Sequence, residues 1–256
     1  MAQECKGEFS LCAFFPFVLL RETYSTDICN MHIHVVAATK FEIQPAASFF
    51  ESESFQINHA NISFGTSGIG LMSATYFLAK QIHTQKPGII IQAGIAGCFE
   101  NDKNNTLVAI KQDVPADIGV FENNTFKNIF DLKLADQNEW PFTNGVLVNP
   151  HEKLLALTEM AQVNAISINE ISTDETKIEW YQQKYSPFVE SMEGAALHFV
   201  CLNEKIPFLQ LRCVSNQIGE RDKSKWTIKE SINTLNNGLI ETIKKISTHD
   251  ETYFRI

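Results

Sequence analysis

From Met31 onward, short runs of β-branched and other apolar residues alternate with longer segments whose apolar residues recur at spacings of three and four. The short runs are typical of strands and the longer segments of helices. This alternation predicts a sheet covered by helices on both faces. The expected strands are 31–37, 59–64, 88–93, 106–112, 163–169 and 207–214, and the expected helices are 40–52, 68–84, 151–161, 174–185, 192–204 and 227–247.

The chain is long enough for one large core, with 256 residues of which 44% are hydrophobic. No repeat or low-complexity linker interrupts the alternation, so residues 31–256 are expected to form a single α/β domain. The stretch 113–145 is the least regular part of it. A long irregular insert in a compact domain is usually a lid or an interface.

Residues 1–30 are expected to lie outside this domain. The apolar run from Ser10 to Leu20 resembles the apolar part of a secretory signal, but acidic Glu4 and Glu8 precede it and no small-residue cleavage site follows. The run is also too short to span a bilayer. We therefore expect translation to start at Met31 and the protein to be cytoplasmic.

The charge balance excludes two classes of partner. Lysine and arginine total 21 against 30 aspartate and glutamate residues, a formal net charge of −9. That sign is wrong for a surface that neutralises nucleic acid phosphates or anionic lipids. The six cysteines lie far apart, with no pair or Cys/His cluster at zinc spacing, so neither a metal nor another cofactor is expected.

Candidate site residues follow the expected strands, because ligands of open α/β sheets gather at the carboxyl ends of strands. Glu42 lies in the first turn of the helix after the first strand. The segment 65–70 after the second strand is a glycine-rich turn that contains Ser67 and Gly68, and 93–97 after the third strand contains four small residues. Such turns can face an anion or a sugar, although tight packing also explains them.

The most specific segment is Glu190-Ser191-Met192-Glu193-Gly194-Ala195-Ala196, at an expected junction between a strand and a helix. Arg212, Ser215 and Asn216 follow about twenty residues later. Glu193 could simply cap the helix, because the helix dipole favours an acid there. A second acid at Glu42, on a neighbouring strand end, makes a shared site the stronger interpretation.

Taken in order from Met31, these motifs resemble the bacterial methylthioadenosine/S-adenosylhomocysteine nucleosidases and their relatives, the futalosine hydrolases. The segment from Ser215 to Trp226 resembles the futalosine hydrolases in particular. Those enzymes serve menaquinone synthesis and release hypoxanthine from a nucleoside with an aromatic carboxylate arm. The resemblance implies a three-layer, nucleoside phosphorylase-like fold with a central mixed, partly barrel-like sheet flanked by helices, and a homodimer that binds a purine nucleoside.

The resemblance also implies roles for individual residues. Glu42 would activate water, and Met192 and Glu193 would hold the ribose. Asn216 falls where the methylthioadenosine enzymes have an aspartate that protonates the base, a role that an amide cannot fill. Further substrate contacts are expected from Ser67, Gly68, Gly94, Ile95, Ala96, Gly97, Ile171, Ser215 and Arg221.

Asn216 favours a 6-oxopurine, whose anion leaves with hydrogen bonding alone. Arg221 could pair with a substrate carboxylate or be a surface charge, and Trp226 and Phe121 could form an apolar wall or belong to the core. The histidines show no ligand spacing.

Three alternatives remain open. The first is a methylthioadenosine or adenosylhomocysteine nucleosidase, and the second is a phosphorylase, which would need cationic groups that the two glycine-rich segments lack. The third is a non-catalytic nucleoside-binding protein, against which the presence of both Glu42 and Glu193 argues.

Overall fold

The structure, a computed structural model, describes residues 31–52, 60–123, 125–249 and 251–254. The predicted extension 1–30 lies outside the described residues. No helix in the described ranges has the length and apolar character that a membrane span requires.

The elements follow the expected alternation. The strands are β1 (Met31–Ala37), β2 (Ala60–Thr66), β3 (Ile89–Cys98), β4 (Leu107–Asp113), β5 (Gly119–Glu122), β6 (Thr125–Asn128), β7 (Leu147–Val148), β8 (Ala161–Ser167), β9 (Val189–Ser191) and β10 (Phe208–Gln217). The α-helices are α1 (Lys40–Ser52), α2 (Leu71–Gln85), α3 (Glu152–Leu157), α4 (Glu175–Tyr185), α5 (Gly194–Glu204) and α6 (Ile228–Ile246). Two short 3-10 helices cover Lys223–Lys225 and Glu251–Phe254.

The main sheet is mixed and closes partly on itself. Its strands run in the order β10-β4-β8-β9-β3-β1-β2, and β10 also pairs with β3, so β3, β9, β8, β4 and β10 form a ring. β1 and β2 extend the sheet beyond β3 in parallel, whereas β10 with β4 and β3 with β9 are antiparallel pairs. This arrangement confirms the predicted mixed, partly barrel-like sheet.

Strand β3 lets the ring form because it changes partner along its length. Its first half, Ile89 to Gln92, pairs with β1, and its last two residues, Gly97 and Cys98, pair with β9. The prediction that the strand ends at residue 93 was therefore wrong: the small residues 93–97 continue the strand instead of forming a turn. They suit a strand that other side chains approach closely.

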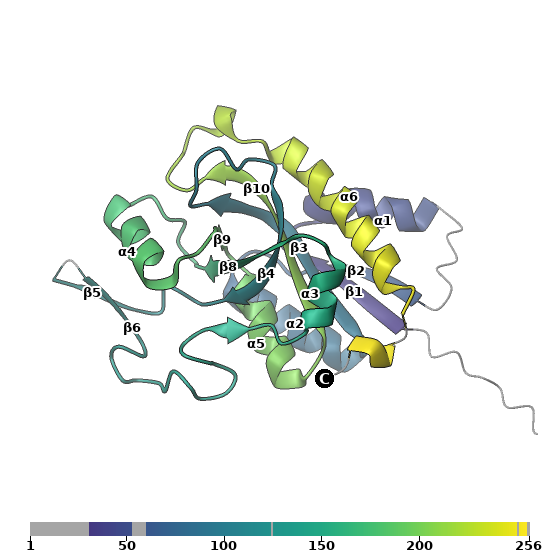
Figure 1. Ribbon diagram of the computed structural model, residues 1–256, viewed down its shortest axis with the longest axis horizontal. Helices are drawn as coiled ribbons and strands as arrows, with labels where there is room; N and C mark the ends of the chain where they lie inside the picture. Colours follow the sequence, from purple (N-terminus) through teal and green to yellow (C-terminus); the bar gives the residue numbers. More distant parts are fainter. Residues whose placement is uncertain (1–30, 53–59, 124, 250, 255–256) are drawn as a thin grey trace, which may run out of the picture.

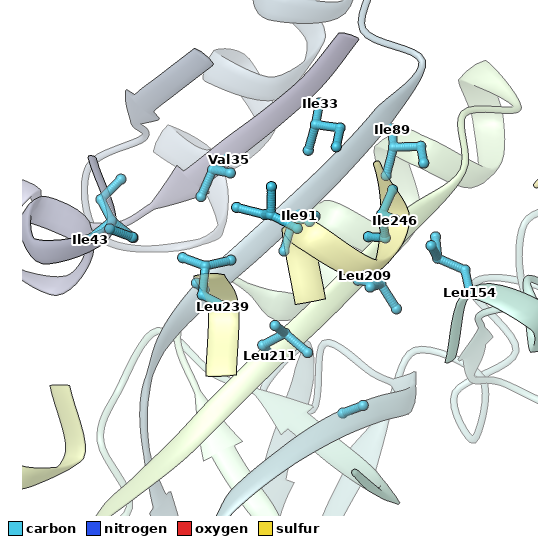
Figure 2. Close-up of a cluster of buried hydrophobic side chains, with 14 of the residues drawn as sticks. Ile33, Val35, Ile43, Ile89, Ile91, Leu154, Leu209, Leu211, Leu239 and Ile246 are labelled. Atoms are coloured by element: carbon cyan, nitrogen blue, oxygen red, sulfur yellow. The ribbon is translucent and has the colours of Figure 1, made fainter. Parts of the chain in front are cut away.

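Helices cover both faces of the flat part of the sheet (Figure 1). On β3, Ile89 and Ile91 point to one face and Ile90 to the other, as the period of two along a strand requires. The first face packs against α1, α3 and α6, and Figure 2 shows Leu239 and Ile246 of α6 over Ile91 and its neighbours. The second face packs against α2 and α5.

Two further predictions needed correction. The helix predicted over 151–161 ends at Leu157, and β8 already begins at Ala161. The irregular stretch 113–145 contains a two-stranded hairpin, β5 with β6, which Figure 1 shows projecting from the body next to α4. Residues of β5 are exposed, so they lack the alternation of buried and exposed side chains by which a strand is predicted.

Candidate active site

A cavity of about 450 Å³ opens at the carboxyl ends of β1, β9 and β10, beside the last residues of β3. Ten of the predicted site residues line it: Glu42, Ile95, Ala96, Gly97, Ile171, Met192, Glu193, Ser215, Asn216 and Arg221. Trp226, which the sequence suggested as an apolar wall, lines it as well. The fold thus brings together residues from five separate parts of the chain.

Glu42 is held in the first turn of α1 by three hydrogen bonds to its carboxylate. Oε2 accepts from the backbone N–H and the hydroxyl of Thr39, both at 3.0 Å, and Oε1 accepts from the N–H of Ile95 at 3.1 Å. The residue is buried and lines the cavity. A carboxylate fixed in this way loses little entropy when it acts as a base.

Glu193 precedes α5, but its side chain makes no capping hydrogen bond to that helix. Its Oε1 instead accepts from the N–H of Gly70 at 3.2 Å, and its Oε2 lies 3.8 Å from Nη2 of the fully buried Arg212. Burial raises the pKa of Glu193, and the charge of Arg212 opposes that rise. Glu193 therefore occupies the N-cap position of α5, but its carboxylate contacts Gly70 and Arg212 and not the helix.

Arg212 gives a physical reason for the glycine at position 94. A Cβ at Gly94 would collide with Nη1 of Arg212 and would lie 3.0 Å from Oε1 of Glu42. The guanidinium also donates from Nη2 to Oε1 of Gln92 at 2.8 Å. Gly94 itself does not line the cavity; its lack of a side chain leaves room for the arginine beside both carboxylates.

A second buried polar network supports the segment that carries Met192 and Glu193. Asp113 accepts hydrogen bonds from the Ser167 hydroxyl at 3.0 Å and from Gln210 Nε2 at 3.0 Å. The Ser167 oxygen in turn accepts from the N–H of Ala195 in the first turn of α5, at 2.8 Å. Burial raises the pKa of Asp113 to about 6. The start of α5 is thus held from beneath by residues of β4, β8 and β10.

Asn216 lies near the end of β10, beside Gly97 of β3. Its Oδ1 accepts from the Ser215 hydroxyl at 2.8 Å, and its Nδ2 donates to the Gln217 carbonyl at 3.0 Å. These contacts set the orientation of the amide and leave the second hydrogen on Nδ2 as a donor.

The remaining predicted residues divide between rim, turn and a second pocket. The Arg221 guanidinium lies 5.6 Å from the centre of the Trp226 ring at the rim. Ser67 and Gly68 do not line the cavity, and the Ser67 hydroxyl donates to the Gly68 carbonyl at 2.9 Å. Phe121 lines a separate, smaller cavity of about 190 Å³. In the described ranges, no cluster of three His, Cys, Asp or Glu side chains could hold a metal ion.

Two functional candidates escaped the sequence analysis even though both lie within quoted motifs. Arg212 is the largest fully buried side chain of the described residues, and Glu190 lines the cavity while being 7% exposed. For Arg212 the signal in the sequence was a charged residue inside a predicted strand, which is costly unless that residue is paired.

Comparisons with known proteins match this chain to one protein family and to two relatives of known activity. A family model described as "Phosphorylase superfamily" matches residues 31–246. Futalosine hydrolase of Thermus thermophilus is 25% identical over 199 residues, which cover 74% of this chain and 87% of the relative. A 5'-methylthioadenosine/S-adenosylhomocysteine nucleosidase of Bacillus velezensis is 27% identical over 166 residues, 60% of this chain and 67% of the relative.

Solved structures show the same fold at lower identity. The native futalosine hydrolase of Helicobacter pylori superposes with a TM-score of 0.71 at 19% identity, covering 84% of this chain and 97% of that one. The methylthioadenosine/S-adenosylhomocysteine nucleosidase of the same organism, in complex with butyl-thio-DADMe-Immucillin-A, gives 0.70 at 20% identity, covering 83% and 97%.

Proposed function

Because the chain belongs to the phosphorylase superfamily, we propose that it is a nucleosidase that hydrolyses the N-glycosidic bond of futalosine and releases hypoxanthine. The observation that carries this proposal is the arrangement of two buried carboxylates, Glu42 and Glu193, at one cavity that Asn216 also lines. The carboxylates suit the sugar and the attacking water, and the amide suits the base.

Glu42 is the base that activates water. Its carboxylate is already oriented by Thr39 and Ile95, so it can accept a proton from a water molecule in the cavity without reorganising. As the glycosidic bond breaks, the ribosyl carbon acquires the character of an oxocarbenium ion. Water that loses its proton to Glu42 then attacks this carbon.

Glu193 accepts hydrogen bonds from the ribose hydroxyls. Its negative charge complements the positive charge that develops on the sugar, so its contacts strengthen in the transition state. Arg212, at 3.8 Å, opposes the rise in the pKa of Glu193 that burial causes, and so favours the ionised carboxylate. Met192 lines the same part of the cavity and provides an apolar contact for the sugar.

Asn216 stabilises the departing base. Both N7 and O6 of hypoxanthine are acceptors, and the orientation of the amide leaves a hydrogen of Nδ2 as a donor. A 6-oxopurine leaves as a delocalised anion, so a hydrogen-bond donor suffices where adenine would need a proton.

Water is the acceptor that the cavity favours over phosphate. Of the residues that line it in the described part of the chain, Arg221 alone is a lysine or arginine, and it lies at the rim over Trp226. A phosphorylase binds its phosphate with cationic groups or a nest of backbone amides. We assign Arg221 instead to the carboxylate of the substrate arm, with which a guanidinium can pair through two hydrogen bonds.

A methylthioadenosine/S-adenosylhomocysteine nucleosidase is the second candidate, because a relative of that name matches at 27% identity. The purified protein should be incubated with futalosine, methylthioadenosine and inosine, with and without phosphate, and the released base identified. We expect hypoxanthine from futalosine at a rate that does not depend on phosphate. Release of adenine alone would favour the second candidate, and no release from any substrate would favour a non-catalytic binding protein.

We also infer a homodimer that completes the cavity. Phe41 and Ile69 line the cavity but are 65% and 61% exposed, and Met72 and Tyr76 of α2 continue this apolar surface at 84% and 71%. An exposed apolar patch of this kind marks an interface. Sedimentation equilibrium should give a dimer mass for the wild type and a monomer mass for Met72→Lys, whereas a monomeric wild type would contradict the proposal.

A further inference from the structure

Helix α5 begins without a capping side chain of its own. Glu193, at its N-cap position, makes no capping hydrogen bond, and the first four residues of the helix are glycine, two alanines and leucine. The first N–H groups of a helix have no acceptor within the helix, and leaving them unpaired in a buried place is costly. These four residues are all buried, so other elements must supply the acceptors.

Two serine hydroxyls supply them. The N–H of Ala195 donates to Oγ of Ser167 at 2.8 Å. The N–H of Gly194 donates to Oγ of Ser191 at the longer distance of 3.4 Å. The next two N–H groups of the helix reach the carbonyl of Glu193 at 3.1 and 3.4 Å. Ser167 on β8 thus accepts the shortest of these four hydrogen bonds, although it lies 28 residues earlier in the chain.

Asp113 fixes the direction of the Ser167 hydroxyl. Its carboxylate is fully buried and accepts hydrogen bonds from that hydroxyl, from the Gln210 amide and from the backbone N–H of the next residue. An ionised carboxylate can only accept, so the hydrogen of Ser167 points to Asp113 and its lone pairs remain for Ala195. The negative charge behind the start of α5 also complements the positive end of the helix dipole.

The hydroxyl of Ser167 occupies the hydrogen bond that the N-cap side chain would otherwise make. An N-cap side chain ordinarily turns back to the N–H of the second or third helical residue. In α5 the second residue is Ala195, and Ser167 already binds its N–H. The carboxylate of Glu193 lines the cavity instead.

We propose that Ser167, oriented by Asp113, caps α5 in place of Glu193 and thereby keeps the Glu193 carboxylate for the ribose. This inference rests on the proposed function, in which Glu193 binds the sugar. Neither Ser167 nor Asp113 lines the cavity, so both are positioning residues that act through Glu193. Without the Ser167 hydroxyl, the unpaired N–H of Ala195 competes with the ribose for the Glu193 carboxylate.

Ser167→Ala tests this role by separating the sugar from the base. The value of kcat/KM for futalosine should fall about 10-fold or more, the scale of a buried N–H left without its acceptor. Calorimetric binding of free hypoxanthine, which carries no ribose, should keep its wild-type affinity, whereas a general loosening of the fold would weaken both. Ser247→Ala is the matched control, because it removes a buried hydroxyl that donates to the Lys244 carbonyl at 2.7 Å, at the C-terminal end of α6. That control should change neither value.

A double-mutant cycle shows whether Ser167 acts through Glu193. Glu193→Gln lowers kcat/KM by itself, and adding Ser167→Ala to it should cause little further loss, because the carboxylate that Ser167 positions is already gone. Additive losses would overturn the role of Ser167. If Ser167→Ala does not fold, Ser167→Cys takes its place with the same expected result, because a thiol accepts hydrogen bonds only weakly.

The outcomes separate this inference from the function on which it rests. If the wild type releases hypoxanthine from futalosine but Ser167→Ala keeps its kcat/KM, or loses hypoxanthine binding to the same extent, the role of Ser167 is overturned and the proposed function stands. If the wild type cleaves methylthioadenosine instead, the release of hypoxanthine is overturned, and the same comparison between methylthioadenosine and adenine decides the role of Ser167. If it cleaves no nucleoside, both are overturned.

Discussion

The side-chain Nδ2 of Asn236 in α6 donates a 2.8 Å hydrogen bond to the backbone carbonyl of Glu42 in α1. Its Oδ1 accepts from the N–H of Ala46 at 2.9 Å, so the amide bridges two groups that an α-helix ordinarily joins to each other. Pro45, which has no N–H to donate, lies inside this turn. The position of the proposed catalytic carboxylate is therefore linked to the C-terminal helix.

Replacing Asn236 with alanine should impair both folding and turnover. The substitution leaves a buried carbonyl and a buried N–H without their partner, at a cost of about 1–3 kcal/mol in the free energy of unfolding. Because the turn that carries Glu42 loosens, kcat should fall more than KM rises. Urea unfolding and steady-state kinetics measure the two effects. Asn237→Ala, at an exposed position of the same helix, is the control. Equal stability and turnover of the two variants would contradict the role of Asn236.

Glu42→Gln should retain substrate binding but lower kcat by about 100-fold or more, the usual contribution of a general base. An amide has the size of the carboxylate but cannot take a proton from water. Substrate affinity should be measured by calorimetry and turnover by release of the base. Glu51→Gln, at the exposed end of the same helix, controls for the loss of one negative charge. Near-normal turnover of Glu42→Gln would remove this residue from the mechanism.

Asn216→Asp should shift the base preference from hypoxanthine toward adenine. A carboxylic acid at this position can deliver a proton to N7, whereas its ionised form repels the O6 of a departing hypoxanthine anion. Each mismatched buried polar group costs about 1–3 kcal/mol, enough to change the ratio by 10-fold or more. The ratio of kcat/KM for a hypoxanthine nucleoside to that for its adenine counterpart reports this shift. A ratio unaffected by the substitution would mean that Asn216 does not contact the base.

Gly194→Ala should destabilise the start of α5. The added methyl would collide with Gln210 Nε2 and Asp113 Oδ2, two buried atoms that are hydrogen-bonded to each other. Overpacking of this kind costs about 1–3 kcal/mol. Because Glu193 immediately precedes the helix, KM should rise as well. If Gly194→Ala unfolds at the same temperature as the wild type and its KM is unchanged, the prediction is wrong, because the hydrogen bond between Gln210 and Asp113 then accommodates the methyl group without loss of stability.

Much of the fold could be predicted because its signals are local. The strand 31–37 and the helix 40–52 have the predicted bounds, since a period of two or of 3.6 residues is set by neighbours in the sequence. Most of the predicted site residues line one cavity for a related reason. The carboxyl ends of strands meet at one edge of a sheet, whatever the order of the strands.

The sequence by itself determined the alternation of strands and helices and placed Glu42 and Glu193 at strand ends. Only the tertiary structure decided how β3 continues through its small residues and how the ring closes over them, because strand pairing joins segments far apart in the chain. The buried contact of Arg212 with Glu193 follows from that closure. A charged residue looks alike in the sequence whether it faces solvent or a cavity; its surroundings, and hence its chemistry, are set by elements that the local pattern does not contain.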